Sequence, residues 1–230
     1  MDSNSLQTAE GLGVLHLFCK ISEQLFHNKK GKLFQAIETA RASSMQVVTV
    51  SILGHKADVA FMVLSNDWAQ LRSFQTAVAA SGLEIVDSYV SLTEISEYAQ
   101  GVPEEMRNAR LYPELPPDDK KAWCFYPMSK RRNPTQNWFT LPFEKRKELM
   151  YEHGASGRKF SGRVLQVITG STGVDNYEWG VTLFCIHPDD LKDVVYTMRF
   201  DEASAEYAEF GPFYSGYVIQ IEDLLNEYTN

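Results

Sequence analysis

One order of strand-like and helix-like segments occurs twice along the chain, and this duplication is what most limits its possible folds. Each copy runs strand, helix, strand, strand, helix, strand. In the first copy the segments span residues 13–21, 23–42, 45–52, 57–65, 67–82 and 83–95. In the second copy they span residues 121–128, 141–154, 163–171, 176–186, 187–207 and 213–221. This order is the split βαβ arrangement of ferredoxin-like folds.

Two such halves predict an α+β fold, because each half has helices on one face of an antiparallel sheet and must bury that sheet. We expect the two ferredoxin-like (βαββαβ) halves, at residues 1–100 and 122–230, to pack as a dimeric α+β barrel. Residues 101–121 are rich in proline and charge, so we interpret them as a linker that runs over the surface.

Turn and capping residues set the expected ends of several segments. Residues 53–56 connect two strands as a hairpin. Asp67 is expected to cap the start of a helix and Gly82 to end it, while Gly154 is expected to end the first helix of the second copy. Pro127 has no N–H to donate, so the strand around it is expected to fray or to lie at a sheet edge.

Composition narrows the class of protein. Hydrophobic residues make up 44% of the 230 residues and charged residues 23%, as in ordinary soluble globular proteins. The formal net charge of -8 argues against nucleic acid as the main partner. We expect neither a membrane span nor a secretory leader, because no apolar run is long enough. Three widely spaced cysteines, Cys19, Cys124 and Cys185, lie in apolar segments and predict buried reduced thiols, as in the cytoplasm.

The strand that leads into the sequence SKRR has an unusual face. Side chains alternate between the two faces of a strand. If the extended conformation continues to Lys130, then Tyr126, Met128 and Lys130 share one face. A phenol, a thioether and an ammonium group are an odd lining for a core. They suit a pocket whose ligand is partly flat and apolar and partly anionic.

His153 lies near the end of the helix predicted at 141–154. Leu149 and Met150 precede it by four and three residues, so they share its helix face and the imidazole is expected to point inward. Two interpretations stay open. A histidine just before Gly154 can complement the helix dipole and cap terminal carbonyls, or it can be a ligand. No CxxC, HExxH or EF-hand loop is present, so a metal site built from protein ligands alone is not expected.

Gln166 shares a strand face with Val164 and Ile168, which places an amide in an apolar row. A buried amide without hydrogen bonds costs about 1–3 kcal/mol, so Gln166 either pairs with neighbouring backbone or faces a ligand. An inward His153 and an inward Gln166 are consistent with two sides of one cavity. A haem-like macrocycle suits such a cavity, with imidazole on the iron, a polar group on the opposite face and basic residues on the carboxylates.

Longer blocks of sequence resemble a known family. YPMSKRR, ELMYEHGASGRKFSGRVLQVITGS, YEWGVTLF and YTMRFDEASAEYAEFGPFYSG closely resemble the coproheme decarboxylases of the chlorite dismutase superfamily, and RLYPELP adds to the match. The resemblance covers nearly the whole second half and is weaker over the first. It implies a peroxide-dependent haem synthase that removes two propionates from iron coproporphyrin III (coproheme), yielding haem b and carbon dioxide. This is the last step of coproporphyrin-dependent haem biosynthesis, and coproheme is both substrate and redox cofactor.

The resemblance also implies residue roles. His153 in EHG matches the proximal iron ligand, and Tyr126 matches the tyrosine whose radical abstracts hydrogen from a propionate. Phenylalanine could not replace this tyrosine, because it has no O–H to surrender. Lys130 matches the lysine associated with the second decarboxylation and its proton transfer, since lysine can hold a carboxylate and release a proton. Met128 lines the same side.

The remaining matches concern the other side of the macrocycle and its carboxylates. Gln166 matches the distal glutamine near the peroxide-binding face. Arg110, Arg199 and Ser204 match residues that contact propionates, and arginine suits bidentate binding of a carboxylate. By resemblance the N-terminal half is structural, the C-terminal half binds the porphyrin and carries the catalysis, and the assembly is a homopentamer with a transient contact to the upstream ferrochelatase.

Three alternative functions remain open. Chlorite dismutases of the same superfamily place an arginine over the iron where this chain has Gln166, which disfavours that activity. A peroxidase of the same fold is a second alternative. A non-enzymatic haem-binding protein is the third, but such a protein would need the iron ligand and the carboxylate anchors without the oxidisable phenol of Tyr126.

Overall fold

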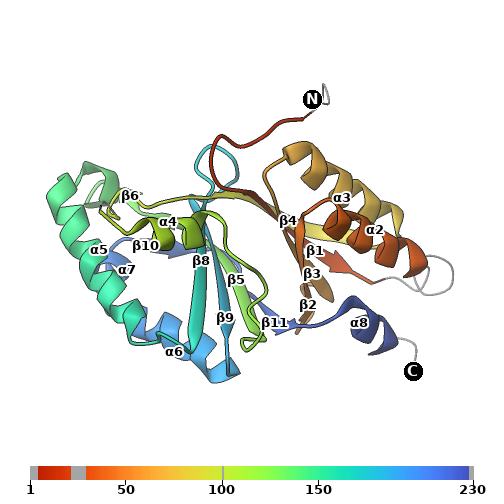
Figure 1. Ribbon diagram of the computed structural model, residues 1–230. Helices are drawn as coiled ribbons and strands as arrows, with labels where there is room; N and C mark the ends of the chain where they lie inside the picture. The colour runs from red at the N-terminus through yellow and green to blue at the C-terminus, as the bar shows by residue number, and fades with distance from the viewer. Residues whose placement is uncertain (1–4, 22–29, 100, 228–230) are drawn as a thin grey trace.

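A computed structural model describes residues 5–21, 30–99 and 101–227. The predicted α+β class is confirmed, with strands in the middle and helices on both flanks (Figure 1). The first half contributes β1 (Gly13–Lys20), β2 (Gln46–Ile52), β3 (Val59–Ser65) and β4 (Glu84–Thr93). The second half contributes β5 (Ala122–Lys130), β8 (Val164–Gly170), β9 (Trp179–Cys185), β10 (Ala208–Phe210) and β11 (Tyr214–Val218). Strands β6 (Arg132–Asn133) and β7 (Gln136–Asn137) form a separate small hairpin.

The strands of both halves join into one antiparallel sheet. Its order is β10-β5-β11-β2-β3-β1-β4-β8-β9, and β5 also pairs with β9, so the sheet closes on itself as a barrel. Within each half the order, β2-β3-β1-β4 and β11-β5-β9-β8, is that of a ferredoxin-like unit. The two predicted hairpins, β2–β3 and β8–β9, are both present.

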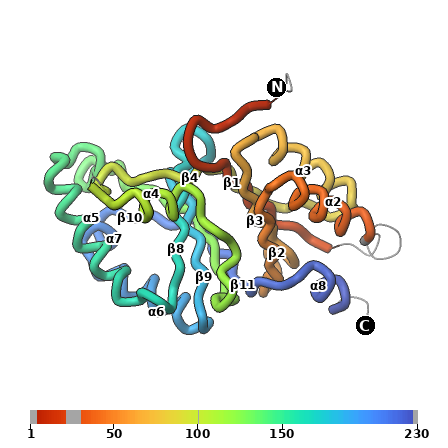
Figure 2. Tube along the Cα trace, in the orientation of Figure 1, coloured from red at the N-terminus to blue at the C-terminus, as the bar shows by residue number. Residues whose placement is uncertain are grey.

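The helices lie outside the sheet, as the trace in Figure 2 shows. In chain order they are α2 (Lys30–Ala42), α3 (Trp68–Ala80), α4 (Glu104–Leu111), α5 (Phe143–Arg158), α6 (Pro188–Met198), α7 (Glu202–Ala205) and α8 (Ile221–Glu227), with a 3-10 turn at Trp138–Thr140. None of these helices has the length and apolar character that a membrane crossing requires. The predicted first helix starts at Lys30 in the structure, and residues 23–29 of that prediction lie outside the described residues.

Several predicted helix ends are confirmed and others are wrong. Asp67 caps α3 by accepting a hydrogen bond from the Ala69 N–H at 2.8 Å, and Gly82 follows in the left-handed region. Helix α5 does not end at Gly154 but continues to Arg158, since glycine inside a helix costs only about 1 kcal/mol and packing overrides it. His153 therefore lies more than a turn before the helix end, which removes the capping interpretation.

The segment predicted as one helix over residues 187–207 is two helices. Helix α6 ends at Met198, and α7 begins after Asp201. The break arises because Asp201 adopts an extended conformation and caps α7 by accepting a hydrogen bond from the Ser204 N–H at 2.9 Å. Helix α4 inside the predicted linker and helix α8 after the last strand were not predicted.

Strand β5 is central, so the expectation of a frayed or edge strand at Pro127 is wrong. On one side β5 pairs with β9, with Pro127 opposite Gly180. On the other side it pairs with β11 as far as Phe125 and with β10 from Met128 onward. Pro127 thus lies where one neighbour replaces the other, so the ladder needs no N–H from it, while its carbonyl accepts from the Gly211 N–H at 2.8 Å.

Alternation along β5 separates two environments. Trp123 and Phe125 point into the barrel interior between the two halves. There the ring centroids of Phe125 and His16 lie 4.2 Å apart. His16 is fully buried, its Nε2 lies 3.1 Å from the Thr182 hydroxyl, and burial lowers its pKa to about 3. On the outer face, Cys124 and Tyr126 pack against α6. The three cysteines are buried and free, as predicted.

Closure of the barrel brings β11 very near β2, and Gly216 allows this approach. A Cβ added at Gly216 would collide with the backbone carbonyl of Ser51. We expect Gly216→Ala to destabilise the fold by about 2 kcal/mol or more and to lower the Tm by at least about 4 °C. Gly31→Ala on α2 is the control, because a Cβ there meets no atom within 4 Å. Equal Tm values for the two variants in thermal unfolding would contradict this account.

Candidate functional site

The imidazole of His153 is oriented by a buried carboxylate. Its Nδ1 lies 3.0 Å from the Asp201 Oδ2 and 3.3 Å from the Ser204 hydroxyl. Burial alone would raise the pKa of Asp201, but hydrogen bonds from His153 and Ser204 lower it below the usual value. The ionised carboxylate favours the proton on Nδ1. This leaves Nε2 with a free lone pair, and no hydrogen bond within the described part of the chain engages it.

Lys130 is buried against the same turn of chain. Its ammonium donates to the Ala203 carbonyl at 2.6 Å and lies 4.4 Å from the centre of the Trp138 ring. Burial lowers the pKa of Lys130 to about 8, opposed by the negative charges of Asp201 and Glu178. Helix α7 and its cap therefore hold both His153 and Lys130, which come from distant parts of the sequence.

Tyr126 is enclosed by aromatic rings. Its ring stacks on Phe213 with centroids 4.5 Å apart and lies 5.6 Å from Phe210. Burial raises the pKa of the Tyr126 phenol, the nearby Cys124 adds to this, and Arg199 opposes it. Among the described residues, no side chain or backbone group forms a hydrogen bond with the Tyr126 hydroxyl. The phenol is thus neutral, held in place by packing and free to act on a ligand.

The outer face of the second-half sheet forms a wall of the site. The register pairs Ile168 with Val181 and Val181 with Tyr126, so all three point to the same side. Ile168 is 44% exposed although it lies in the middle of the sheet. Such an exposed apolar side chain, beside a buried phenol, is expected where a flat apolar ligand would lie.

Gln166 shares this face with Ile168, as predicted, but the expectation of a buried amide is wrong. Gln166 is half-buried, because the wall is open to solvent at this position. Its amide can therefore bond water and needs no protein partner. Met128 is also half-buried on this face and packs at the edge of the cluster around Tyr126.

The three predicted carboxylate-binding residues have different surroundings. Ser204 is buried beside His153. Arg199 is exposed at the end of α6, with its guanidinium carbon 4.8 Å from the centre of the Phe210 ring and thus near Tyr126. Arg110 is exposed in the last turn of α4, and within the described chain no hydrogen bond or ion pair connects it to the other site residues.

Three residues that shape the site were not predicted. Asp201 could have been found, since an Asp three residues before Ser204 is a helix-capping pattern. Glu178 is buried, and its carboxylate accepts a hydrogen bond from the backbone N–H of Lys130 at 2.8 Å, which anchors the end of β5. Trp138 lies in NW, which also resembles the family, but the motif assigns it no role because its position over Lys130 arises only from the tertiary packing.

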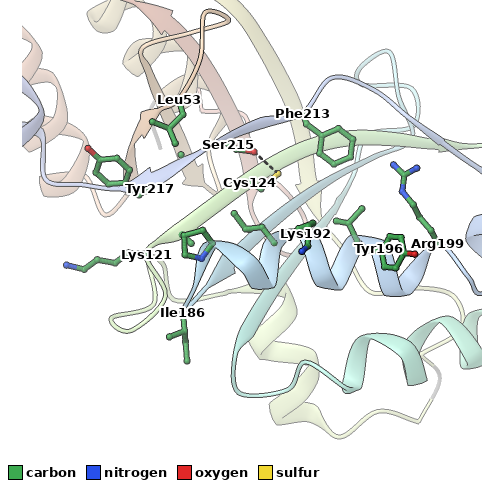
Figure 3. Close-up of a pocket in the computed structure, with 15 residues that line it drawn as sticks. Leu53, Lys121, Cys124, Ile186, Lys192, Tyr196, Arg199, Phe213, Ser215 and Tyr217 are labelled. Atoms are coloured by element: carbon green, nitrogen blue, oxygen red, sulfur yellow. Dashed lines mark hydrogen bonds between the residues drawn. The ribbon is translucent and has the colours of Figure 1, made fainter.

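A separate cavity of about 960 Å³ lies between α6 and β11 (Figure 3). Phe213 and Arg199 line it and also adjoin the Tyr126 side of the site, whereas His153, Lys130 and Gln166 are not among its lining residues. Inside it, the Ser215 hydroxyl donates to the Cys124 sulfur at 3.6 Å. This cavity therefore lies beside Tyr126 on the same face of β5 and is not the space between His153 and the sheet.

In the part of the chain that the structure describes, no group of three or more His, Cys, Asp or Glu could hold a metal ion. A metal bound through His153 would have to bring its other ligands, as iron does in a macrocycle. Residues 27–219 match the chlorite dismutase family. The coproheme decarboxylase of Staphylococcus carnosus (strain TM300) is 40% identical across 96% of this chain and 97% of that protein. The chain belongs to the chlorite dismutase family.

Solved structures agree with this assignment. A haem-binding protein from Thermus thermophilus shares 34% sequence identity with a TM-score of 0.85, over 98% of both chains. A variant of chlorite dismutase from Candidatus Nitrospira defluvii shares only 17% identity, with a TM-score of 0.78 over 97% of both chains. The second likeness shows the common fold alone.

Burial of Lys130 predicts a pH dependence of stability. The pKa of Lys130 is about 8 in the folded protein, below the usual lysine value of 10.5. Between these pH values the unfolded chain binds more protons, so stability rises with pH. We expect the free energy of unfolding, relative to a Lys130→Met variant, to increase by about 3 kcal/mol over this range. Denaturant titrations at several pH values would measure it.

Lys192→Met is the control, because the Lys192 side chain is 78% exposed. Its substitution should leave the pH dependence of unfolding unchanged. The difference in free energy of unfolding between wild type and Lys130→Met should increase with pH. A difference that stays constant, or that falls as pH rises, would contradict the assigned burial of the Lys130 ammonium.

Proposed function

We propose that the chain is a coproheme decarboxylase that converts iron coproporphyrin III to haem b by hydrogen peroxide-dependent oxidative decarboxylation of two propionates. The identity to the Staphylococcus carnosus coproheme decarboxylase supports the substrate class. The observation that carries the proposal is Tyr126, a buried phenol without a protein hydrogen-bond partner among the described residues, on the same strand face as Lys130. A site that only held a porphyrin would not need this phenol.

The residues fit an iron porphyrin. The free Nε2 of His153 would hold the iron, and the hydrogen bond from Nδ1 to Asp201 would make the imidazole a stronger donor. The exposed side chain of Ile168 would give the macrocycle an apolar surface, and the half-buried Gln166 on the same wall would add a polar group. When bound, the iron porphyrin supplies the redox chemistry with peroxide, and the protein supplies the binding, orientation and protons.

Tyr126 is the residue that reacts with the propionate. Its phenol would give up a hydrogen atom and, as a tyrosyl radical, take one from the carbon chain of a propionate, which restores the phenol. The carbon chain would then give up its second electron to the peroxide oxidant that the bound iron porphyrin supplies, as carbon dioxide leaves and the vinyl double bond forms. The stacked Phe213 holds the ring in one orientation. The absence of a protein acceptor, within the described residues, leaves the hydroxyl free to point at the substrate.

Lys130 holds a carboxylate and moves a proton. A lysine whose pKa is about 8 is charged at neutral pH and can still release a proton. Arg199, Ser204 and, by resemblance, Arg110 bind the other carboxylates, with Arg199 placed nearest to the Tyr126 side.

Assembly and location extend the proposal. We propose a homopentamer in the cytoplasm that makes a transient contact with the upstream ferrochelatase, on the basis of family resemblance and of the three buried free cysteines. Chlorite dismutation is disfavoured because this chain has Gln166 where, by the resemblance, chlorite dismutases have an arginine.

The test is a Tyr126→Phe variant. Coproheme should bind with unchanged affinity, because His153 is intact, while decarboxylation with peroxide should slow at least about 100-fold. Mass spectrometry of the porphyrin would follow loss of each carboxyl group. Tyr214→Phe is the control. Tyr214 is similarly buried but lies away from the site, and its hydroxyl donates to the Asp87 Oδ2 at 2.6 Å. If the wild type binds coproheme without losing mass, the decarboxylase function is wrong; normal conversion by Tyr126→Phe would exclude only the radical role.

A further inference from the structure

A carboxylate from the N-terminal half reaches the wall of the site. Glu94 is the first residue after β4, and its side chain lies over Gly170 at the end of β8, where a Cβ would collide with the carboxylate. The Trp179 indole N–H donates to the Glu94 Oε1 at 3.0 Å. Two features therefore hold this carboxylate against the sheet, a glycine that leaves room for it and an indole that binds it.

The register places Glu94 on the same face as the proposed reacting groups. Gly170 pairs with Trp179, and Trp179 pairs with Met128, in the row next to that of Ile168 and Tyr126. The order across this row is Glu94, Gly170, Trp179 and Met128. The N-terminal half thus contributes an ionisable group to a wall otherwise built by the C-terminal half.

The chain after Glu94 connects this wall to the helix that carries His153. Tyr98 stacks on Phe143 at the start of α5, with ring centroids 5.7 Å apart, and its hydroxyl accepts from the Arg146 Nε at 2.9 Å. In Figure 1 this segment leaves β4 and runs towards the α5 side of the molecule. Glu94 is solvent-exposed, so it has access both to bulk water and to the site face.

The proposed reaction consumes protons. For each propionate, R–CH2–CH2–COO⁻ + H2O2 + H⁺ gives R–CH=CH2 + CO2 + 2 H2O. The carbon chain loses two electrons and peroxide gains them, so one proton must enter from solvent per carboxyl group removed. Lys130 can deliver a proton, but its ammonium is buried and bound to the Ala203 carbonyl, which separates it from bulk water.

We propose that Glu94 is the group through which these protons enter the site from solvent; this inference rests on the proposed function. As a carboxylic acid it releases a proton to water inside the site and takes another from bulk water. The pairing with Trp179 keeps the carboxyl on the wall during this exchange.

The electrostatics of Glu94 suit the role. Enclosure by the surrounding protein raises its pKa, and the hydrogen bond from Trp179 opposes this. Charged groups on the neighbouring elements have partners of their own. Glu97 pairs with Arg146, Glu178 with Arg132 and the Lys130 backbone N–H, and Asp175 with the Val90 N–H. Glu94 is therefore protonated more often near neutral pH than an ordinary surface glutamate.

Two variants test the proposal. Glu94→Gln keeps an acceptor for Trp179 but cannot carry a proton. Gly170→Ala keeps the acid but moves it off the wall, and the clash involves only the end of a flexible side chain. Glu97→Gln is the matched control, since Glu97 lies on the same segment and pairs with Arg146 at 3.4 Å. Coproheme affinity, conversion rate against pH, and rescue by added formic or acetic acid are measured for each.

We expect both site variants to bind coproheme like wild type and to convert it about tenfold or more slowly. The wild-type conversion rate should fall as pH rises through the pKa of Glu94. The Glu94→Gln variant should lack this fall, and added formic or acetic acid should restore its conversion rate. Glu97→Gln should behave as wild type. A Glu94→Gln rate equal to wild type, or a loss that small acids do not restore, overturns the proposal. Failure of wild type to convert coproheme would instead refute the proposed function.

Discussion

Strand β5 packs against a different environment on each of its two faces. The packing of its inner face determines the position of the site. Trp123 and Phe125 are buried in the aromatic interior between the two halves, where a one-residue slip would exchange them with Cys124 and Tyr126. That slip would place a thiol and a phenol in the interior and move two large aromatic rings to the outer face, so both clusters would have to repack around side chains of the wrong size. The interior therefore sets the register that presents Tyr126, Met128 and Lys130 outward.

A second constraint joins parts of the chain that are far apart in sequence. The carboxylate of Asp201 caps α7, orients His153 and lowers the free energy of the charged form of Lys130. These tasks require an ionised group that is itself buried, and its hydrogen bonds maintain that state. The short break between α6 and α7 makes the Asp201 carboxylate available to the α7 cap, to His153 and to Lys130. In a continuous helix the backbone N–H groups of this turn would bond within the helix, and no cap would form.

Sequence patterns predicted the fold class, both hairpins, the cap at Asp67 and the shared face of Tyr126 and Lys130, because each of these depends on local periodicity or on a single turn residue. They failed where tertiary packing decides the outcome. Gly154 looked like a helix end, but α5 continues to Arg158 and packs against α6 and α7, which no local signal around Gly154 reveals. Pro127 looked like an edge signal, but the change from β11 to β10 removes the need for its N–H.

The site residues show the same division. Motifs indicated His153 and Tyr126, whereas Trp138 over Lys130, and Glu94 over Gly170, follow from contacts between segments that no spacing relates.

The protein in the described structure holds groups that burial alone disfavours. The Tyr126 ring is buried, and among the described residues its hydroxyl forms no hydrogen bond to the protein. Lys130 is charged at neutral pH although desolvation opposes it. Methionine at position 130 would pack in a similar volume without this cost. The cost falls when a carboxylate lies within reach, because it pairs with the ammonium, and a carboxylate would also give the Tyr126 hydroxyl an acceptor. The energetics of the ligand-free fold thus favour a ligand with carboxylates at this edge, which is where the substrate of a decarboxylase must present them.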